Sequence, residues 1–359
     1  MQLQQLKRQL SNFLISRAAK LVFRRLFLKL PRFFWKEVAL KLLELVLAIN
    51  FPIFLGWIFK QLNLFPDKES AVLRKFVIKV TVPFLIFRNL YNADTKEFSQ
   101  MLPMIMSLCL ILVLSATLVI LLRNLSSSDK KVSNSFCVGS FVGNYSYLGW
   151  GVLSYFYGES GFTRGVFFSM FFWPAVLSTG FTMIWFLSRT SSGQTSKDKI
   201  IHALTSNAIP PVVSAALAMA LNFYGVKLPA WLTQSIGSIA NITIPAILFT
   251  VGLSLSLMLK KETVRPVISG TFFRTIFGIT VGIVVMLIVS FCFKNVDITT
   301  KKVILMESVM PSAATSPFFA DFVDSDKEVV SGIVTFSTIF SLVTLPFWYF
   351  MIEKWSPLL

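Results

Sequence analysis

The feature that most constrains this chain is a series of ten apolar stretches, each long enough to cross a bilayer. A spanning helix needs about 20 mostly apolar residues. Hydrophobic residues make up 55% of the 359 residues and charged residues only 14%. A soluble domain of this length cannot bury that much apolar surface, whereas lipid accepts it directly. We therefore predict an all-α integral membrane protein. The predicted spans are 41–59, 71–91, 102–122, 134–156, 163–187, 202–224, 231–258, 267–293, 302–322 and 329–352.

The cations are concentrated in the N-terminal tail, residues 1–40. Its first 36 residues carry nine Lys or Arg and no Asp or Glu, within a formal net charge of +17. Leu, Phe and Val recur between these cations at roughly helical spacing, which favours an amphipathic helix lying in the membrane interface. A cleaved mitochondrial presequence, which is also Arg-rich and acid-free, is the alternative. We expect no nucleic-acid partner, because the rest of the chain lies in lipid.

The two halves of the chain share a short motif. Residues 79–87 read KVTVPFLIF and residues 241–249 read NITIPAILF. The polar linker 188–200 separates a first repeat of five spans, residues 41–187, from a second, residues 201–359. Because five is odd, the second repeat enters the membrane from the opposite side, and such inverted repeats are typical of secondary transporters. The residues expected where the repeats meet are Thr81, Pro83, Asn241, Thr243 and Pro245.

The fourth span of each half contains residues that interrupt helices. Glycines and polar residues lie within 140–161, and two prolines lie within 306–322. An interrupted helix exposes main-chain groups, which a membrane protein tolerates only against protein or a wet cavity. The helix that begins after the break favours anions at its N-terminus. The expected break residues are Gly143, Gly149, Gly151, Pro311 and Pro317. We predict that the two breaks cross at one central site; a pair of kinked helices without a site is the alternative.

The polar residues at these breaks are the predicted substrate-binding residues. They are Asn144, Tyr145, Ser146, Ser312 and Thr315. Two ionisable residues inside predicted spans are candidates for charge balance or coupling, because a charge within the membrane is costly and usually functional. Lys79 would offset an anionic substrate, or alternatively extend to the membrane surface. Glu307 would carry a coupling proton, or alternatively pair with Lys79 or Lys301.

The segments 52–87, 143–161, 243–256 and 310–322 resemble the auxin efflux carrier family, which includes the plant PIN proteins and bacterial malate or malonate carriers. The resemblance covers about residues 45–353. It implies ten helices in two inverted five-helix repeats, with a scaffold domain and a transport domain whose helices four and nine are broken and cross. The bile-acid sodium symporters are similar in architecture. Gly151 departs from the family pattern, which has proline there.

Together these features predict a secondary active or facilitative transporter of a small organic anion, either a dicarboxylate or an auxin-like acid, working by alternating access. A membrane sensor that keeps the fold without moving solute is the alternative. We expect no enzymatic activity, because the loops contain no paired acidic motif, nucleophile–base pair or metal cluster. We expect no cofactor or bound metal, with H⁺ or Na⁺ as the coupling ion. The expected setting is the plasma membrane or a bacterial inner membrane, with a homodimer left open.

Overall fold

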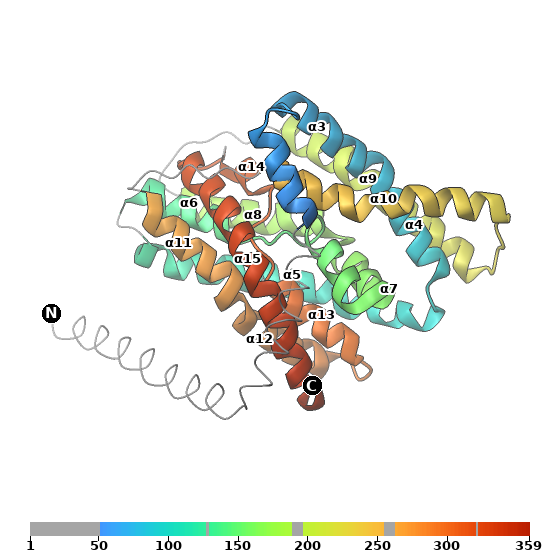
Figure 1. Ribbon diagram of the computed structural model, residues 1–359. Coiled ribbons are helices and arrows are strands. Elements are labelled where there is room, and N and C mark those ends of the chain that lie inside the picture. The colour runs from blue at the N-terminus through green and yellow to red at the C-terminus, as the bar shows by residue number, and fades with distance from the viewer. Residues whose placement is uncertain (1–50, 127–128, 189–196, 255–262, 321) are drawn as a thin grey trace, which may run out of the picture. The chain divides into compact units, whose positions relative to one another are not determined.

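A computed structural model describes residues 51–126, 129–188, 197–254, 263–320 and 322–359 (Figure 1). The predicted N-terminal tail and most of the predicted linker 188–200 lie outside the described residues. All the described residues belong to one compact unit, Ala48–Leu359. The elements within them are helices, joined by short loops and one isolated pairing of two extended residues.

The first half of the chain forms its helices close to the predicted spans. A helix covers 51–61 at the start of the described chain. It is followed by α3 (Asp67–Phe76), the π-helical turn η1 (Val77–Thr81), α4 (Val82–Asn92), the 3₁₀ turn η2 (Thr95–Gln100), α5 (Met101–Ser126), α6 (Lys130–Ser140), α7 (Gly149–Ser169) and α8 (Phe172–Ser188).

The second half repeats this sequence of long helices and breaks. It consists of α9 (Lys197–Phe223), α10 (Ala230–Ser254), α11 (Val264–Phe272), the π-helical turn η4 (Phe273–Phe277), α12 (Gly278–Cys292), α13 (Ile298–Ser308), α14 (Ser316–Ala320), α15 (Lys327–Trp355) and the 3₁₀ turn η5 (Ser356–Leu358).

Four helices of the described chain are long and apolar enough to cross a membrane: Thr95–Asn124, Ala230–Leu253, Val264–Cys292 and Lys327–Trp355. The pair α7 and α8 would make a fifth, although it is bent by 47°. The all-helical prediction is confirmed, together with several helices able to span a membrane. The arrangement of ten spans in two inverted repeats stays a prediction.

The bend between α7 and α8 falls within the predicted span 163–187. Pro174 lies in the first turn of α8. A proline has no N–H to bond the carbonyl four residues earlier, and its ring clashes with that turn, so it fits best at the start of a helix. The chain therefore starts a new helix at Phe172 in place of one straight span.

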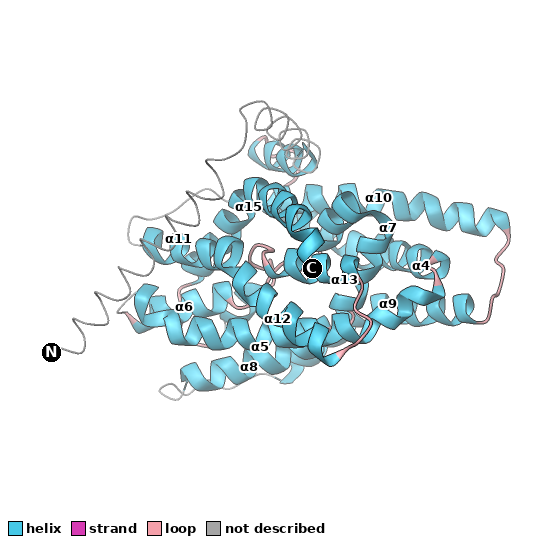
Figure 2. Ribbon diagram, turned by 90° about the horizontal axis from the view of Figure 1, so that it is seen from below, coloured by secondary structure: helices cyan, strands magenta, loops and turns pink. Residues whose placement is uncertain are grey.

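The helices divide into two groups by their contacts, and both views show α4 and α10 of the first group on the opposite side from α6 and α11 of the second (Figures 1 and 2). The first group contains the helix 51–61, α3, α4, α9 and α10, with α4 packed against both α9 and α10. The second group contains α5 to α8 and α11 to α15, in which α11 packs on α15 and α12 on α13. Gly56 and Gly252 bring the helix 51–61 and α10 so close that a Cβ at either would collide with the other main chain.

The repeated motifs meet inside the first group. The Thr243 hydroxyl donates a hydrogen bond to the main-chain oxygen of Thr81 over 2.9 Å. Asn241, the counterpart of Lys79, accepts a hydrogen bond from Arg88 over 2.5 Å. The main-chain oxygen of Pro83 accepts one from Ser214 on α9. Pro245 lies within α10 and is exposed.

Candidate functional site

The breaks in the two interrupted helices lie against each other. The first break, residues 141–148, separates α6 from α7, and the second, residues 309–315, separates α13 from α14. Gly143 and Ser312 pair in antiparallel fashion. The Asn144 N–H donates to the Pro311 oxygen over 2.8 Å, and the Ala313 N–H donates to the Val142 oxygen over 3.0 Å. The main-chain groups freed by each break are thus bonded by the other, as burial requires.

Local chemistry explains the first break. A Cβ at position 143 would collide with the Arg274 guanidinium and the Tyr145 ring, so any other residue there would have to displace these buried side chains. Asn144 holds the turn that leads into α7: its side-chain oxygen accepts from the Leu148 N–H over 3.4 Å, and its main-chain oxygen accepts from the Gly149 N–H over 3.0 Å.

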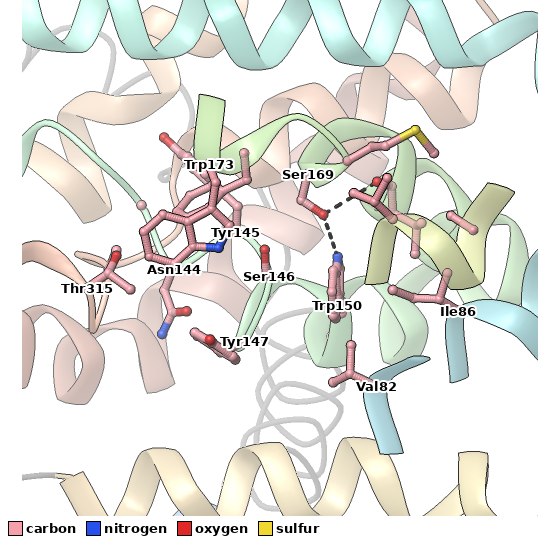
Figure 3. A pocket seen from close by; sticks show the side chains of 17 residues that line it. Val82, Ile86, Asn144, Tyr145, Ser146, Tyr147, Trp150, Ser169, Trp173 and Thr315 are labelled. Carbon is pink, nitrogen blue, oxygen red and sulfur yellow. Dashed lines mark hydrogen bonds between the residues drawn. The ribbon is translucent and has the colours of Figure 1, made fainter. Parts of the chain in front are cut away.

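A pocket lies beside the crossing, with a cavity volume of about 70 Å³. Because one water needs about 10–15 Å³ by this measure, it has room for several waters or a compact organic group. Figure 3 shows Asn144, Tyr147 and Thr315 in one part of the pocket and Trp150, Val82 and Ile86 in the other. The other lining residues are Gly143, Tyr145, Ser146, Val166, Ser169, Met170, Phe172, Trp173, Val212, Ala215 and Ala313.

Two polar groups in the pocket remain available to a ligand. The hydroxyl of Thr315 and the amide nitrogen of Asn144 have no hydrogen-bond partner within the part of the chain that the structure describes. The Trp150 indole, by contrast, already donates to the Ser169 hydroxyl over 2.9 Å (Figure 3). The residues lining this pocket are uncharged. The pocket therefore offers hydrogen bonds at one end and aromatic surface elsewhere.

Residues 41–349 match the family model for membrane transport proteins. The chain belongs to this family. It is 27% identical over 314 residues to an uncharacterized transporter of Methanothermobacter thermautotrophicus, covering 85% of this chain and 96% of that protein. It is 25% identical over 313 residues to an uncharacterized transporter of Methanocaldococcus jannaschii, covering 85% and 97%. The family confirms the resemblance found in the sequence to auxin-efflux-type carriers and shows a membrane transporter.

The predicted substrate-binding residues of this transporter have different surroundings. Asn144, Ser146 and Thr315 line the pocket. Tyr145 also lines the pocket, but its side chain is fully buried against Phe168 and Phe172, and its hydroxyl lies 3.5 Å from the Arg274 guanidinium.

Ser312 does not line the pocket. It is fully buried, and its hydroxyl donates to the Gly139 oxygen over 2.5 Å, while its N–H donates to the Ser337 hydroxyl. Ser312 therefore holds the second break in place.

The predicted break residues divide in a similar way. Gly143 and Pro311 lie within the breaks, whereas Gly149 is the first residue of α7 and Gly151 lies in its first turn. Pro317 lies in α14, next to that helix's first residue, where proline is favoured.

Arg274 is a residue that the sequence reasoning missed. It lies in η4, is 1% exposed, and donates to the Met310 oxygen from both Nε (3.1 Å) and Nη2 (2.9 Å). Its guanidinium carbon lies 5.7 Å from the centre of the Tyr145 ring. The guanidinium therefore supports both breaks at once. An arginine inside the predicted span 267–293 was the available signal, because buried charges in membranes are rarely accidental.

The two predicted charge residues lie in contrasting settings. Glu307, in α13, is fully buried, and within the described chain neither carboxylate oxygen has a hydrogen-bond partner. A Cβ at Gly149 would lie 2.9 Å from one of these oxygens, so the glycine leaves space for the carboxyl group. Lys79, in η1, is exposed and does not line the pocket. Lys301, the other proposed partner of Glu307, instead donates to the Leu359 main-chain oxygen.

Proposed function

We propose that this transporter carries a small organic anion through the pocket beside the crossing. The observation that supports it most is the pairing of two interrupted helices next to a cavity with two available hydrogen-bond donors, on Asn144 and Thr315. Donors held by a fixed main chain suit a carboxylate, because charge-assisted hydrogen bonds are about twice as strong as neutral ones. A membrane sensor that binds the anion without moving it remains the alternative, and flux separates the two.

The lining favours an anion with a flat apolar body and one carboxylate. Tyr147, Trp150, Phe172 and Trp173 supply aromatic surface, and the described lining residues carry no cation. A dicarboxylate would place a second charge against these rings without a counter-charge, which is costly in an apolar site. An auxin-like aromatic acid therefore fits better than malate or malonate.

The proposed mechanism is alternating access. The pocket is lined by Val82 and Ile86 of α4 and by Val212 and Ala215 of α9, from the first helix group, and by the crossing, from the second. A shift of one group against the other would open the pocket to one side of the membrane at a time, as in transporters built around a fixed site. The setting would be the plasma membrane or a bacterial inner membrane, with oligomeric state left open.

Glu307 is the proposed proton carrier. A buried carboxylate without partners is unfavourable when ionised, so the protonated form is the one that this site accommodates well. A movement that exposes Glu307 to water or pairs it with a cation would release the proton. Proton release would then be coupled to transport of the substrate. Na⁺ is the other proposed coupling ion. A Glu307→Gln variant that keeps the full response to a pH gradient would exclude the proton role.

Uptake into proteoliposomes tests the proposed function. The purified full-length protein is reconstituted, and initial rates are measured for labelled indole acetate, malate and malonate with and without a pH gradient. We expect saturable uptake of indole acetate. Thr315→Val, which keeps the side-chain shape, should raise its KM about fivefold, the equivalent of roughly 1 kcal/mol for one hydrogen bond. The control is Thr280→Val, because Thr280 is exposed on α12 and its hydroxyl donates to the Phe277 main-chain oxygen in the turn just before that helix.

Three outcomes would contradict the proposal in different ways. Uptake of malate without uptake of indole acetate would overturn the substrate class. Binding of indole acetate without any flux would support the sensor. Equal KM values for Thr315→Val and Thr280→Val would remove Thr315 from the site.

A further inference from the structure

A second cavity lies against the crossing, with a volume of about 190 Å³. Its described lining residues come from α3, η1, α10 and the two breaks: Arg74, Val77, Tyr147, Thr250, Val251, Ala314 and Thr315. Tyr147 and Thr315 also line the central pocket. These two side chains therefore stand between the cavities, and a molecule passing from one to the other must move past them.

The second cavity differs from the central pocket in charge. Arg74 is the charged residue among its described lining residues, whereas the central pocket has none. Arg74 is exposed, and within the described chain its guanidinium makes no hydrogen bond or ion pair. A guanidinium presents five N–H donors in a planar array that matches a carboxylate. Its donors are thus available to a carboxylate in the cavity.

We propose that the second cavity is an entry chamber in which Arg74 binds the carboxylate of the organic anion before Tyr147 and Thr315 admit it to the central pocket. This proposal deepens the proposed function and rests on it, since it assigns a second site to the same substrate. The chamber captures the charge, and the central pocket then takes up the apolar body. Thr315, whose buried hydroxyl has no partner in the described chain, lines both cavities.

Electrostatics explains why the cation lies in the second cavity and not in the central pocket. An uncharged aromatic pocket attracts a dilute anion weakly, whereas a cation in a cavity with low-dielectric walls raises the local anion concentration. A permanent cation in the central pocket would instead hold the anion too tightly for release. A guanidinium in the neighbouring cavity attracts the anion toward the central pocket without holding it there. Arg74 should therefore affect the concentration dependence of transport more than its maximal rate.

The first test measures the charge of the chamber without using transport. Ala314 is exposed and lines the second cavity but not the central pocket. Ala314→Cys is made with the exposed cysteines removed as Cys109→Ser and Cys292→Ser; Cys137 is buried. The reaction rates with an anionic and a cationic methanethiosulfonate are then compared. We expect Arg74→Gln to lower the anionic-to-cationic rate ratio about fivefold. The matched control Lys75→Gln, an exposed lysine on the same helix outside the cavity, should leave it unchanged.

The second test measures equilibrium binding and uptake of indole acetate by the full-length protein. Arg74→Gln should weaken binding and raise the KM about tenfold, with the maximal rate within about twofold, and Arg74→Lys should recover part of the loss. Equal reagent ratios and equal KM values for Arg74→Gln and Lys75→Gln would overturn the chamber while leaving the proposed function intact. If the anionic-to-cationic rate ratio at Ala314→Cys depends on Arg74 as expected but neither the parent protein nor any variant takes up indole acetate, the proposed function is overturned instead.

Discussion

The two breaks at the crossing differ in what surrounds them. The first break, built on Gly143, places Asn144 and Ser146 in the pocket. The second, built on Pro311, also places Thr315 in the pocket, but its Ser312 hydroxyl and Met310 oxygen are buried in hydrogen bonds with neighbouring elements. The first break thus presents its polar side chains mainly to a ligand, whereas the second presents Thr315 and uses Ser312 and Met310 to hold the crossing together. Sequence position alone does not decide which polar residues of a break face the pocket.

The largest expected effect comes from filling the space at Gly143. Gly143→Ala would push the new methyl group into the Arg274 guanidinium and the Tyr145 ring. We expect a loss of stability of about 3 kcal/mol, at the upper end for overpacking, and a clearly lower thermal unfolding temperature in detergent. The control is Gly151→Ala, whose methyl group would meet the side-chain ends of Leu248 at 3.3 Å and Ile244 at 3.5 Å, with no closer contact. Equal unfolding temperatures for the two variants would mean that the breaks are not packed as described.

Removing the Arg274 guanidinium tests the support of both breaks. Arg274→Leu keeps an apolar stem but leaves the buried Met310 oxygen without its two N–H donors. An unsatisfied buried acceptor costs about 1–3 kcal/mol, so we expect a loss of about 2 kcal/mol in thermal unfolding experiments. Arg274→Lys should lose less, because it can still donate one hydrogen bond. A Leu variant as stable as the parent protein would show that the second break does not need this support.

The same substitution at the two breaks sharpens the contrast. Ser312→Ala removes the hydroxyl that bonds Gly139, so we expect a loss of stability of about 1 kcal/mol with the KM for indole acetate unchanged. Ser146→Ala removes a pocket hydroxyl and should do the reverse, raising the KM about threefold at constant unfolding temperature. If Ser312→Ala and Ser146→Ala both lower the unfolding temperature and both leave the KM unchanged, Ser146 has no role in binding.

The smallest expected effect concerns the ends of α7 and α13 away from the breaks. There Arg164 of α7 lies 3.1 Å from Glu97 and 2.5 Å from Asp297, the residue that caps α13. Partial burial of Asp297 opposes its ionisation, but hydrogen bonds from Arg164 and Thr300 outweigh it, so the pKa of Asp297 lies below its usual value. The folded state therefore gains stability above the ordinary aspartate pKa of about 3.9 and loses it as the pH falls through the lower folded value.

The unfolding temperature should accordingly stay level from neutral pH to about pH 5 and fall below about pH 4. Because Asp297 is 38% exposed, solvent screening limits its contribution to less than about 1 kcal/mol. In Asp297→Asn the decline should be shallower. A variant whose pH profile matches the parent protein would show that this contact does not anchor the two helices.

The sequence predicts the membrane class and the positions of the breaks, because long apolar runs, glycines and prolines act locally. It does not predict which polar residues face the pocket. Tyr145 and Ser312 lie at the breaks as expected, but each forms a hydrogen bond with a residue distant in sequence. The Arg274 guanidinium donates to the Tyr145 hydroxyl, and the Gly139 oxygen accepts from the Ser312 hydroxyl. The bend at Phe172 follows from Pro174 and was readable. The partnership of Arg274, in η4, with Met310 depends on the packing of the following helix α12 on α13, which no local pattern encodes.

The most direct test of the account is an experimental structure of the full-length protein in lipid nanodiscs with bound indole acetate. We expect the carboxylate within hydrogen-bond distance of the Asn144 amide nitrogen or the Thr315 hydroxyl, with the ring against Trp150 or Trp173. An anion seated instead against Arg274 and Ser312, away from Asn144 and Thr315, would contradict the assignment of binding to this pocket.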